Sequence, residues 1–168
     1  MSILDWPLIA QTRRNHGLEH ATVHILSAQY PGLSIAGRST PNGIYIYGEL
    51  TVEQIQSAVA EALARLRAGE SHLVIHPGCG TNLATSGALA GAASFAVINV
   101  GQRRSRTRWE TLPTAILAAT LALLIAQPLG PFFQEHITTS ADMSTMEILG
   151  VWRTNIGGLP VHRIDTHS

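Results

Sequence analysis

The order of apolar and polar positions divides the chain into three regions. Residues 1–81 mix both classes at helical and strand spacings, residues 82–133 contain two long apolar runs, and residues 134–168 return to a mixed pattern. We expect a small α/β domain, a transmembrane helical hairpin and a polar tail, in that order.

The first region predicts a helix followed by a β-hairpin. Apolar residues recur at helical spacing from Arg13 to Gln29, and Pro31-Gly32 ends the pattern. "LSIAGRS" and "GIYIYGEL" then flank the turn sequence "TPNG". Short β-rich runs around such a turn are typical of a hairpin.

A second helix and a third strand complete this domain. "TVEQIQSAVAEALARLRAGE" has one apolar stripe, with Thr51 and Gln54 spaced for a capping box and Gly69 at its end. "HLVIH", residues 72–76, predicts a buried strand. The expected order is helix, strand, strand, helix, strand.

The two apolar runs, residues 82–100 and about 111–133, are each long enough to cross a bilayer. Two core helices of a soluble protein are the alternative. Gly87 and Gly91 form a small-xxx-small pair, which lets helices pack closely in lipid. This face predicts a homo-oligomer or a larger membrane complex.

The tail alternates apolar and polar residues around residues 155–158, which predicts a C-terminal β-hairpin that packs on the first domain. The fold class is therefore α/β (α+β), with a two-helix transmembrane hairpin between the first domain and this β-hairpin.

Composition supports a membrane protein. Charged residues are 13% of the chain, against roughly 25% in soluble domains. None lies between Glu70 and Arg103 or between Glu110 and Glu135. The lipid bilayer is thus an expected partner. The formal net charge is zero, so nucleic acid is not.

Membrane sidedness stays open. The four arginines of the loop between the apolar runs favour a cytoplasmic loop. An eighty-residue domain without a signal peptide, and a reduced cysteine, favour a cytoplasmic N-terminal region instead. The loop arginines are Arg103, Arg104, Arg106 and Arg108.

The sequence "NHGLEHATVH" contains a candidate metal motif. His16 and His20 are four residues apart, so a helix places both imidazoles on one face. Glu19 between them is the expected general base, acting on a metal-activated water. H-x-x-E-H is the reversed zincin motif. Proteases with this motif use a downstream glutamate as third ligand, and here no acidic residue lies between Glu70 and Glu110, which weakens a peptidase assignment.

A second cluster, "HPGCGTN", adds His76 and Cys79 after the expected strand. Together with His16 and His20 they make three nitrogens and one sulfur, a ligand set typical of tetrahedral zinc. Ferrous iron and manganese remain alternatives. Cys79 has two further interpretations, an inert buried thiol or a nucleophile with His76 as its base.

The other histidines have weaker assignments. His24 lies one turn beyond His20 and is expected as a supporting or packing residue more often than as a ligand. Solvent-exposed positions are expected for the rest, which are His72, His136, His162 and His167.

The stretches "RNHGLEHATVHIL", "GRSTPNGIYIYGEL" and "HPGCGTNL" together resemble an uncharacterised family of bacterial membrane proteins, found in cyanobacteria and other phototrophic or filamentous bacteria. The two histidine motifs also resemble the YqhQ-like family of predicted metal-dependent enzymes. The resemblance implies an integral protein of the bacterial inner membrane, with a metal site on His16, Glu19, His20, His76 and Cys79.

These observations predict a membrane-anchored, metal-dependent protein, with hydrolase chemistry as the leading reaction class. The alternative is a non-catalytic accessory or assembly subunit of a membrane complex, with a structural metal or none. A third hypothesis is that histidines bind a haem or a chlorin as axial ligands, although the chain has no c-type attachment motif.

Overall fold

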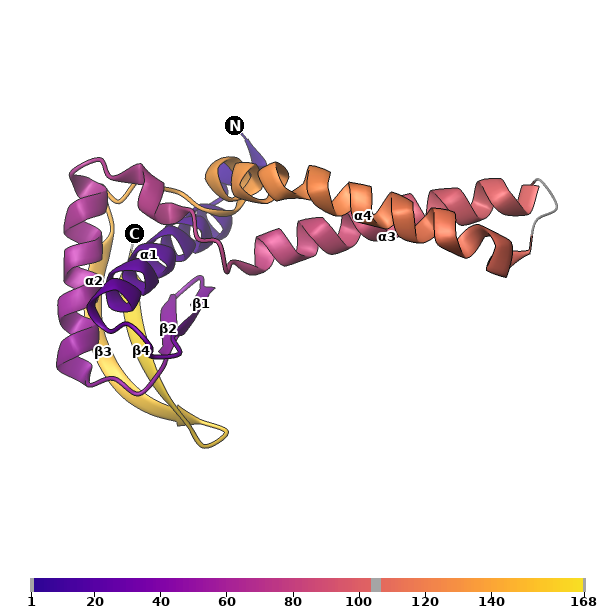
Figure 1. Ribbon diagram of the computed structural model, residues 1–168. Helices are drawn as coiled ribbons and strands as arrows, with labels where there is room; N and C mark the ends of the chain where they lie inside the picture. The colour runs from indigo at the N-terminus through magenta and orange to yellow at the C-terminus, as the bar shows by residue number, and fades with distance from the viewer. Residues whose placement is uncertain (1, 104–106, 168) are drawn as a thin grey trace. The chain divides into compact units, whose positions relative to one another are not determined.

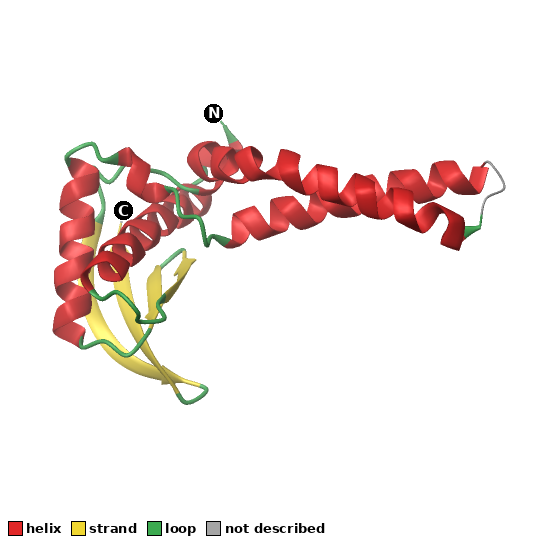
Figure 2. Cartoon of the chain, in the orientation of Figure 1, coloured by secondary structure: helices red, strands yellow, loops and turns green. Residues whose placement is uncertain are grey.

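The computed structural model describes residues 2–103 and 107–167, which form two compact units (Figure 1). The globular unit joins Met1–His76 to Gln134–Ser168, so both ends of the chain contribute to it. The helical unit is Pro77–Phe133. Figure 2 shows that the strands belong to the first unit and that helices make up the second.

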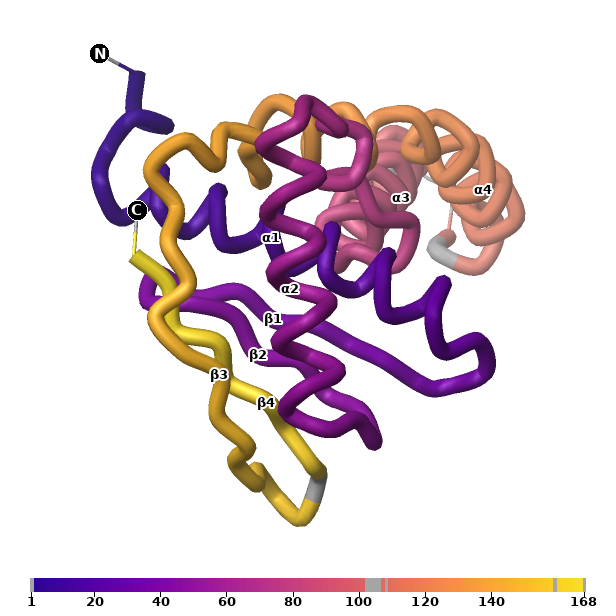
Figure 3. Tube along the Cα trace, turned by 90° about the vertical axis from the view of Figure 1, so that its left-hand side faces the viewer, coloured from indigo at the N-terminus to yellow at the C-terminus, as the bar shows by residue number. Residues whose placement is uncertain are grey.

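The globular unit contains a four-stranded antiparallel sheet with the strand order β1-β2-β4-β3. The strands are β1 (Ala36–Thr40), β2 (Gly43–Tyr47), β3 (Glu147–Ile156) and β4 (Leu159–His167). The two hairpins join where β2 pairs with β4 (Figure 3). The C-terminal hairpin expected around residues 155–158 is thus confirmed, and it supplies half of the sheet.

Two helices pack on this sheet. α1 (Pro7–Gln29) contacts β1 and β2, while α2 (Val52–Arg67) contacts α1 and β3. Ile44, Ile46 and Ile164 are fully buried in the common core. Since neighbouring residues of a strand point to opposite faces, this core covers one face of the sheet.

Local sequence signals explain the helix ends. α1 starts earlier than the expected Arg13, because Pro7 suits a first helical turn, where a missing N–H breaks no hydrogen bond. The capping box of α2 is confirmed: Thr51 Oγ1 accepts from the Gln54 N–H, and Gln54 Oε1 accepts from the Thr51 N–H. Gly69, with φ of 97°, follows the helix.

The strand expected at residues 72–76 is wrong. Ser71–Val74 forms a short 3-10 helix, η2, which contacts α1. The apolar letters correctly indicate burial of Leu73 and Val74. Instead of joining the sheet, the segment packs on α1, where the oxygens of Val74 and Ile75 hydrogen-bond to side chains of that helix.

The exposed position expected for His162 is also wrong. His162 lies opposite Ile46 on the face of β4 that points into the core, and its side chain is fully buried. The pattern of the tail predicted a hairpin but not which other strand that hairpin would pair with. The buried face of β4 therefore follows only from its pairing with β2.

The helical unit consists of α3 (Gly80–Arg103) and α4 (Arg108–Phe133), which pack along each other. Two glycines allow close approach: a Cβ at Gly101 would meet Thr111, and one at Gly130 would meet Asn82. Arg104 and Arg106 of the loop lie outside the described residues.

Both helices are long and apolar enough to cross a membrane. The candidate spans are Gly80–Gly101 and Trp109–Thr138, where the second includes the π-helical turn η3 (Gln134–Thr138). Large apolar side chains are exposed along both, among them Leu83, Phe95, Leu117 and Ile125. An apolar exterior of this kind suits lipid.

Candidate metal centre

One side of α1 carries the histidines of the first motif. His20 is buried, and the rings of His16 and His20 lie 4.4 Å apart between centroids. Their ligating nitrogens come within 4.8 Å of each other. The i, i+4 spacing therefore produces the expected pair inside the globular unit.

His76 extends this pair. Its ring centroid lies 5.7 Å from that of His20 and 4.7 Å from that of His24. The four rings, in the order His16, His20, His76 and His24, form a continuous group that we call the imidazole row. The sequence predicted three of its members as ligands and gave His24 a supporting role.

Backbone carbonyls orient three of these rings. His16 Nδ1 lies 3.0 Å from the Thr138 oxygen, and His20 Nδ1 lies 2.6 Å from the Val74 oxygen. His24 Nε2 lies 2.8 Å from the oxygen of Ile75. A carbonyl can only accept, so each of these nitrogens carries the proton and donates it. In the neutral rings the lone pair is then on His16 Nε2, His20 Nε2 and His24 Nδ1. Metal-binding histidines are typically fixed in this way.

The segment before the helical unit supplies two of these carbonyls, which explains its irregular path. Val74 and Ile75 direct their oxygens at α1, and the His76 N–H donates to Gln134 Oε1 over 2.8 Å. Gln134 is itself fully buried. A strand would have used these backbone groups for pairing instead.

Gly17 has a steric role between the candidate ligands. A Cβ at this position would meet the backbone oxygen of Ser140. Ser140 N–H in turn donates to the Arg13 oxygen over 3.0 Å. The glycine thus lets residues 138–140 approach α1, which brings the Thr138 oxygen to His16.

Glu19 lies within the same site and is largely buried. One of its oxygens is 3.8 Å from His16 Nε2, and its side chain packs against Gly37 of β1, where a Cβ would collide with it. The lone pair of a neutral His16 therefore faces a carboxylate. Two such groups repel unless a proton or a metal ion lies between them, so this donor set fits a cation.

Burial, followed by the neighbouring His24 and then His20, lowers the pKa of His76 from 6.5 to about 4. His76 is therefore neutral at physiological pH, which is the form in which an imidazole can coordinate a metal.

Cys79 belongs to the helical unit, three residues after His76 in the chain. Its sulfur accepts a hydrogen bond from the Thr81 N–H over 3.4 Å, at the start of α3. A donor at a helix N-terminus stabilises negative charge on sulfur, the form in which cysteine binds metals.

Sequence reasoning missed the groups that support the histidines. The carbonyls of Thr138, Val74 and Ile75 leave no sequence signal, since every residue has one. Gly17 and Gly37 do offer a signal, because each glycine lies inside an expected helix or strand and not in a turn. Among the scattered histidines, His72, His136 and His167 are exposed as expected.

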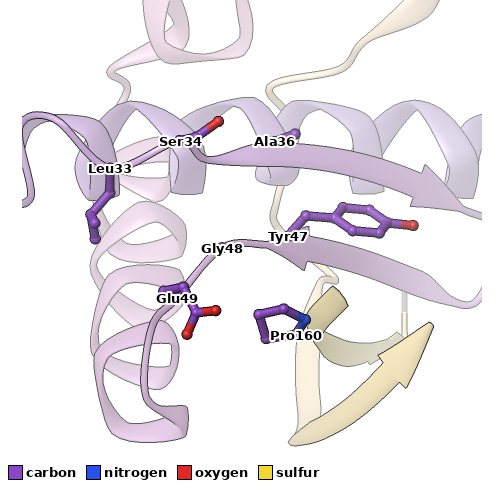
Figure 4. A pocket seen from close by; sticks show the side chains of 7 residues that line it. All are labelled: Leu33, Ser34, Ala36, Tyr47, Gly48, Glu49 and Pro160. Carbon is purple, nitrogen blue, oxygen red and sulfur yellow. The ribbon is translucent and has the colours of Figure 1, made fainter. Parts of the chain in front are cut away.

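A separate groove lies at the end of β2 (Figure 4). It has a volume of about 320 Å³, and its lining residues are Leu33, Ser34, Ala36, Tyr47, Gly48, Glu49 and Pro160. It shares no residue with the imidazole row, and its lining offers one carboxylate and no histidine.

Comparison with known proteins identifies a family and one relative. The model of DUF6391, a domain of unknown function, matches residues 11–151. An uncharacterised protein of the cyanobacterium Picosynechococcus sp. is 34% identical over 145 residues, which cover 79% of this chain and 67% of that protein. No solved structure matches the chain. The expected resemblance to an uncharacterised family with cyanobacterial members is confirmed.

Proposed function

Since the chain belongs to the DUF6391 family, whose function is unknown, we propose an activity from the site itself. The protein is a membrane-anchored, metal-dependent hydrolase of the bacterial inner membrane. His16, His20, His76 and Cys79 bind the ion, and Glu19 is the general base.

The imidazole row is the observation that supports this proposal most. A polar helix face would leave its histidines in water. Here His20 is buried, and three rings donate one N–H to a carbonyl, which directs the other nitrogen elsewhere. A histidine whose ring is oriented by such a hydrogen bond can bind a metal ion through its other nitrogen. Cys79 follows His76 closely enough in the chain to complete the ligand set, because three residues span at most about 10 Å.

Glu19 supplies the basic group that hydrolysis requires. Its oxygen is 3.8 Å from a candidate ligating nitrogen, so a water molecule at the site lies within reach of the carboxylate. A bound zinc ion would acidify that water and polarise the substrate carbonyl or phosphoryl group. Glu19 then accepts the proton, while Gly37 leaves space for its side chain.

The metal content of the purified protein tests this proposal. We expect about one zinc per chain in detergent-purified protein, and its loss from a His16→Ala, His20→Ala double variant. Plasma mass spectrometry also detects iron and manganese, the alternative ions. A His72→Ala, His167→Ala variant is the matched control, because both histidines are exposed. Metal-free wild type, or equal metal in all three proteins, would refute the site.

Glu19→Gln separates binding from catalysis. The amide keeps the size of the side chain and cannot accept a proton, so metal should remain while hydrolysis is lost. A panel of ester, peptide and phosphoester substrates in detergent or vesicles provides the readout. If the variant retains full hydrolysis of a substrate that the wild type cleaves, Glu19 is not the base.

A non-catalytic accessory subunit is the second candidate. Gly87 and Gly91 lie on the exterior of α3, where an added Cβ would meet open space. A homo-oligomer or a larger membrane complex would use this face for helix packing. Gly87→Ile with Gly91→Ile should then reduce the size of the detergent-solubilised particle, whereas Ala88→Ile should have a smaller effect. An unchanged monomer in all variants would contradict this role.

A further inference from the structure

The N-terminal segment holds three large apolar side chains in solvent. Ile3 is 70%, Trp6 63% and Leu8 67% exposed. These residues belong to the short 3-10 helix η1 (Ile3–Asp5) and the beginning of α1. Ser2 caps η1: its N–H donates to Asp5 Oδ2 over 2.8 Å, and its hydroxyl accepts from the Leu4 N–H. The apolar side chains are thus displayed by a folded segment.

This segment lies near the point where the chain leaves the second candidate span. The Arg13 guanidinium donates to the His136 oxygen over 3.2 Å, and the Arg13 oxygen accepts from the Ser140 N–H. His136 and Ser140 lie at the end of, and just after, the span that ends at Thr138. Trp6 precedes Arg13 by two helical turns, about 10 Å.

We propose that Ser2–Leu8 is an interfacial membrane anchor. Ile3, Trp6 and Leu8 insert between the lipid headgroups of the bilayer that the helical unit crosses. Tryptophan favours this depth, and Arg14 follows within two turns of Leu8, where anionic headgroups would meet its charge. This inference rests on the membrane location in the proposed function, but not on the metal.

The anchor has a consequence for the candidate metal centre. Leu8 and His16 are on the same helix, separated by about 12 Å along its axis. A fixed N-terminal turn of α1 therefore holds the imidazole row close to the membrane surface. An amphipathic substrate that lies among the lipid headgroups would therefore reach the imidazole row more easily than a fully water-soluble substrate.

The three tryptophans of the chain provide the test. Trp6 is in the proposed anchor, Trp109 begins the second candidate span, and Trp152 lies exposed on β3. Double Trp→Phe variants leave one of them in each protein. The purified full-length proteins are reconstituted in phosphatidylcholine–phosphatidylglycerol vesicles, in which part of the phosphatidylcholine carries bromine at a shallow or a deep acyl position.

We expect Trp6 fluorescence to shift to shorter wavelength and to lose intensity with shallow bromine more than with deep bromine. Trp109 should be quenched too, and Trp152 should not. Quenching of Trp109 without Trp6 overturns the anchor and leaves the membrane hairpin intact. If neither is quenched, the membrane location fails and the anchor with it. A shifted Trp6 spectrum without quenching means a protein contact, such as a second copy, and overturns the proposal.

Leu8→Gln, in the protein that keeps Trp6, provides a second measurement. It removes one of the three inserted side chains, so bromine quenching of Trp6 should decrease. Leu33→Gln is the matched control, because Leu33 is exposed beyond the other end of α1. Equal quenching in the two variants would show that Leu8 does not contact lipid.

Discussion

At the residue scale, Gly17 has a packing role that the metal motif around it does not indicate. It lies between His16 and Glu19 in a helix, where glycine is intrinsically unfavourable. The backbone oxygen of Ser140 occupies the space of a Cβ, and Met143 and Val74 lie close by. The absence of a side chain therefore serves the contact between α1 and residues 138–143.

Gly17→Ala should destabilise the protein and weaken metal binding together. The Ser140 oxygen belongs to the backbone and cannot rotate away as a side chain could. We therefore expect overpacking to lower the free energy of unfolding by about 1–3 kcal/mol. The Thr138 oxygen should move away from His16. Thermal unfolding in detergent and zinc content are the measurements. Gly91→Ala is the control, since a Cβ there meets nothing. An unaffected Gly17→Ala variant would contradict the close contact.

His162 predicts a pH dependence of stability. Burial, followed by the charge of Arg153, lowers its pKa below 6.5. The unfolded chain then binds a proton more tightly than the folded one. This contribution to stability is therefore present above about pH 6.5, and it is lost as the pH falls through the folded pKa.

A His162→Leu variant tests this prediction. Wild type should lose more thermal stability than the variant between neutral and mildly acidic pH, as measured by thermal unfolding. His167→Leu, at an exposed position of the same strand, should behave like wild type. Parallel acid sensitivity of wild type and His162→Leu would show that His162 does not titrate with unfolding.

At the element scale, the ends of α2 depend on neighbours in the sequence. Thr51 and Gln54 hydrogen-bond to each other's backbone N–H, at 3.3 Å and 2.7 Å. The same helix buries Ile55, Val59 and Leu63 along one side. Its boundaries and its buried face were both predictable, because they depend on residues within one or two turns.

Thr51→Ala should lower the free energy of unfolding by about 1 kcal/mol, since one N–H at the start of α2 loses its partner. Chemical denaturation measures this change. Ser57→Ala is the control: Ser57 is exposed in the middle of α2, where alanine favours the helix. An equal loss in both variants would exclude a capping effect.

At the scale of the whole molecule, Asn15 connects three parts of the globular unit. Its amide group donates to the oxygens of Thr40 and Pro41, and its own oxygen accepts from the Thr166 hydroxyl over 2.6 Å. α1, the β1–β2 turn and the last strand are joined in this way directly beside His16. The side chains of Asn15 and Thr166 are both buried, and the two residues lie at opposite ends of the sequence.

Thr166→Val should lower the free energy of unfolding by about 1–3 kcal/mol, because the buried Asn15 oxygen loses its donor while the side-chain volume at position 166 is preserved. The loss should appear in thermal unfolding as a single transition of the globular unit. Thr154→Val, exposed on β3, should have little effect. If the two variants unfold alike, the link between Asn15 and β4 does not stabilise the unit.

The sequence by itself determined the features that depend on nearby residues. Helical spacing placed His16 and His20 together, turn residues predicted both hairpins, and uncharged runs predicted two long apolar helices. Each depends on groups only a few positions apart, so periodicity and local hydrogen bonds are sufficient to predict it.

Tertiary structure decided the rest. Pairing of β4 with β2 buried His162, and packing on α1 made residues 71–74 a 3-10 helix in place of the expected strand. The same segment then turned its carbonyls to the histidines of α1 and brought His76 beside His24. Backbone carbonyls are identical in every residue, and pairing between distant strands depends on which surfaces remain unburied. Neither leaves a local pattern in the sequence.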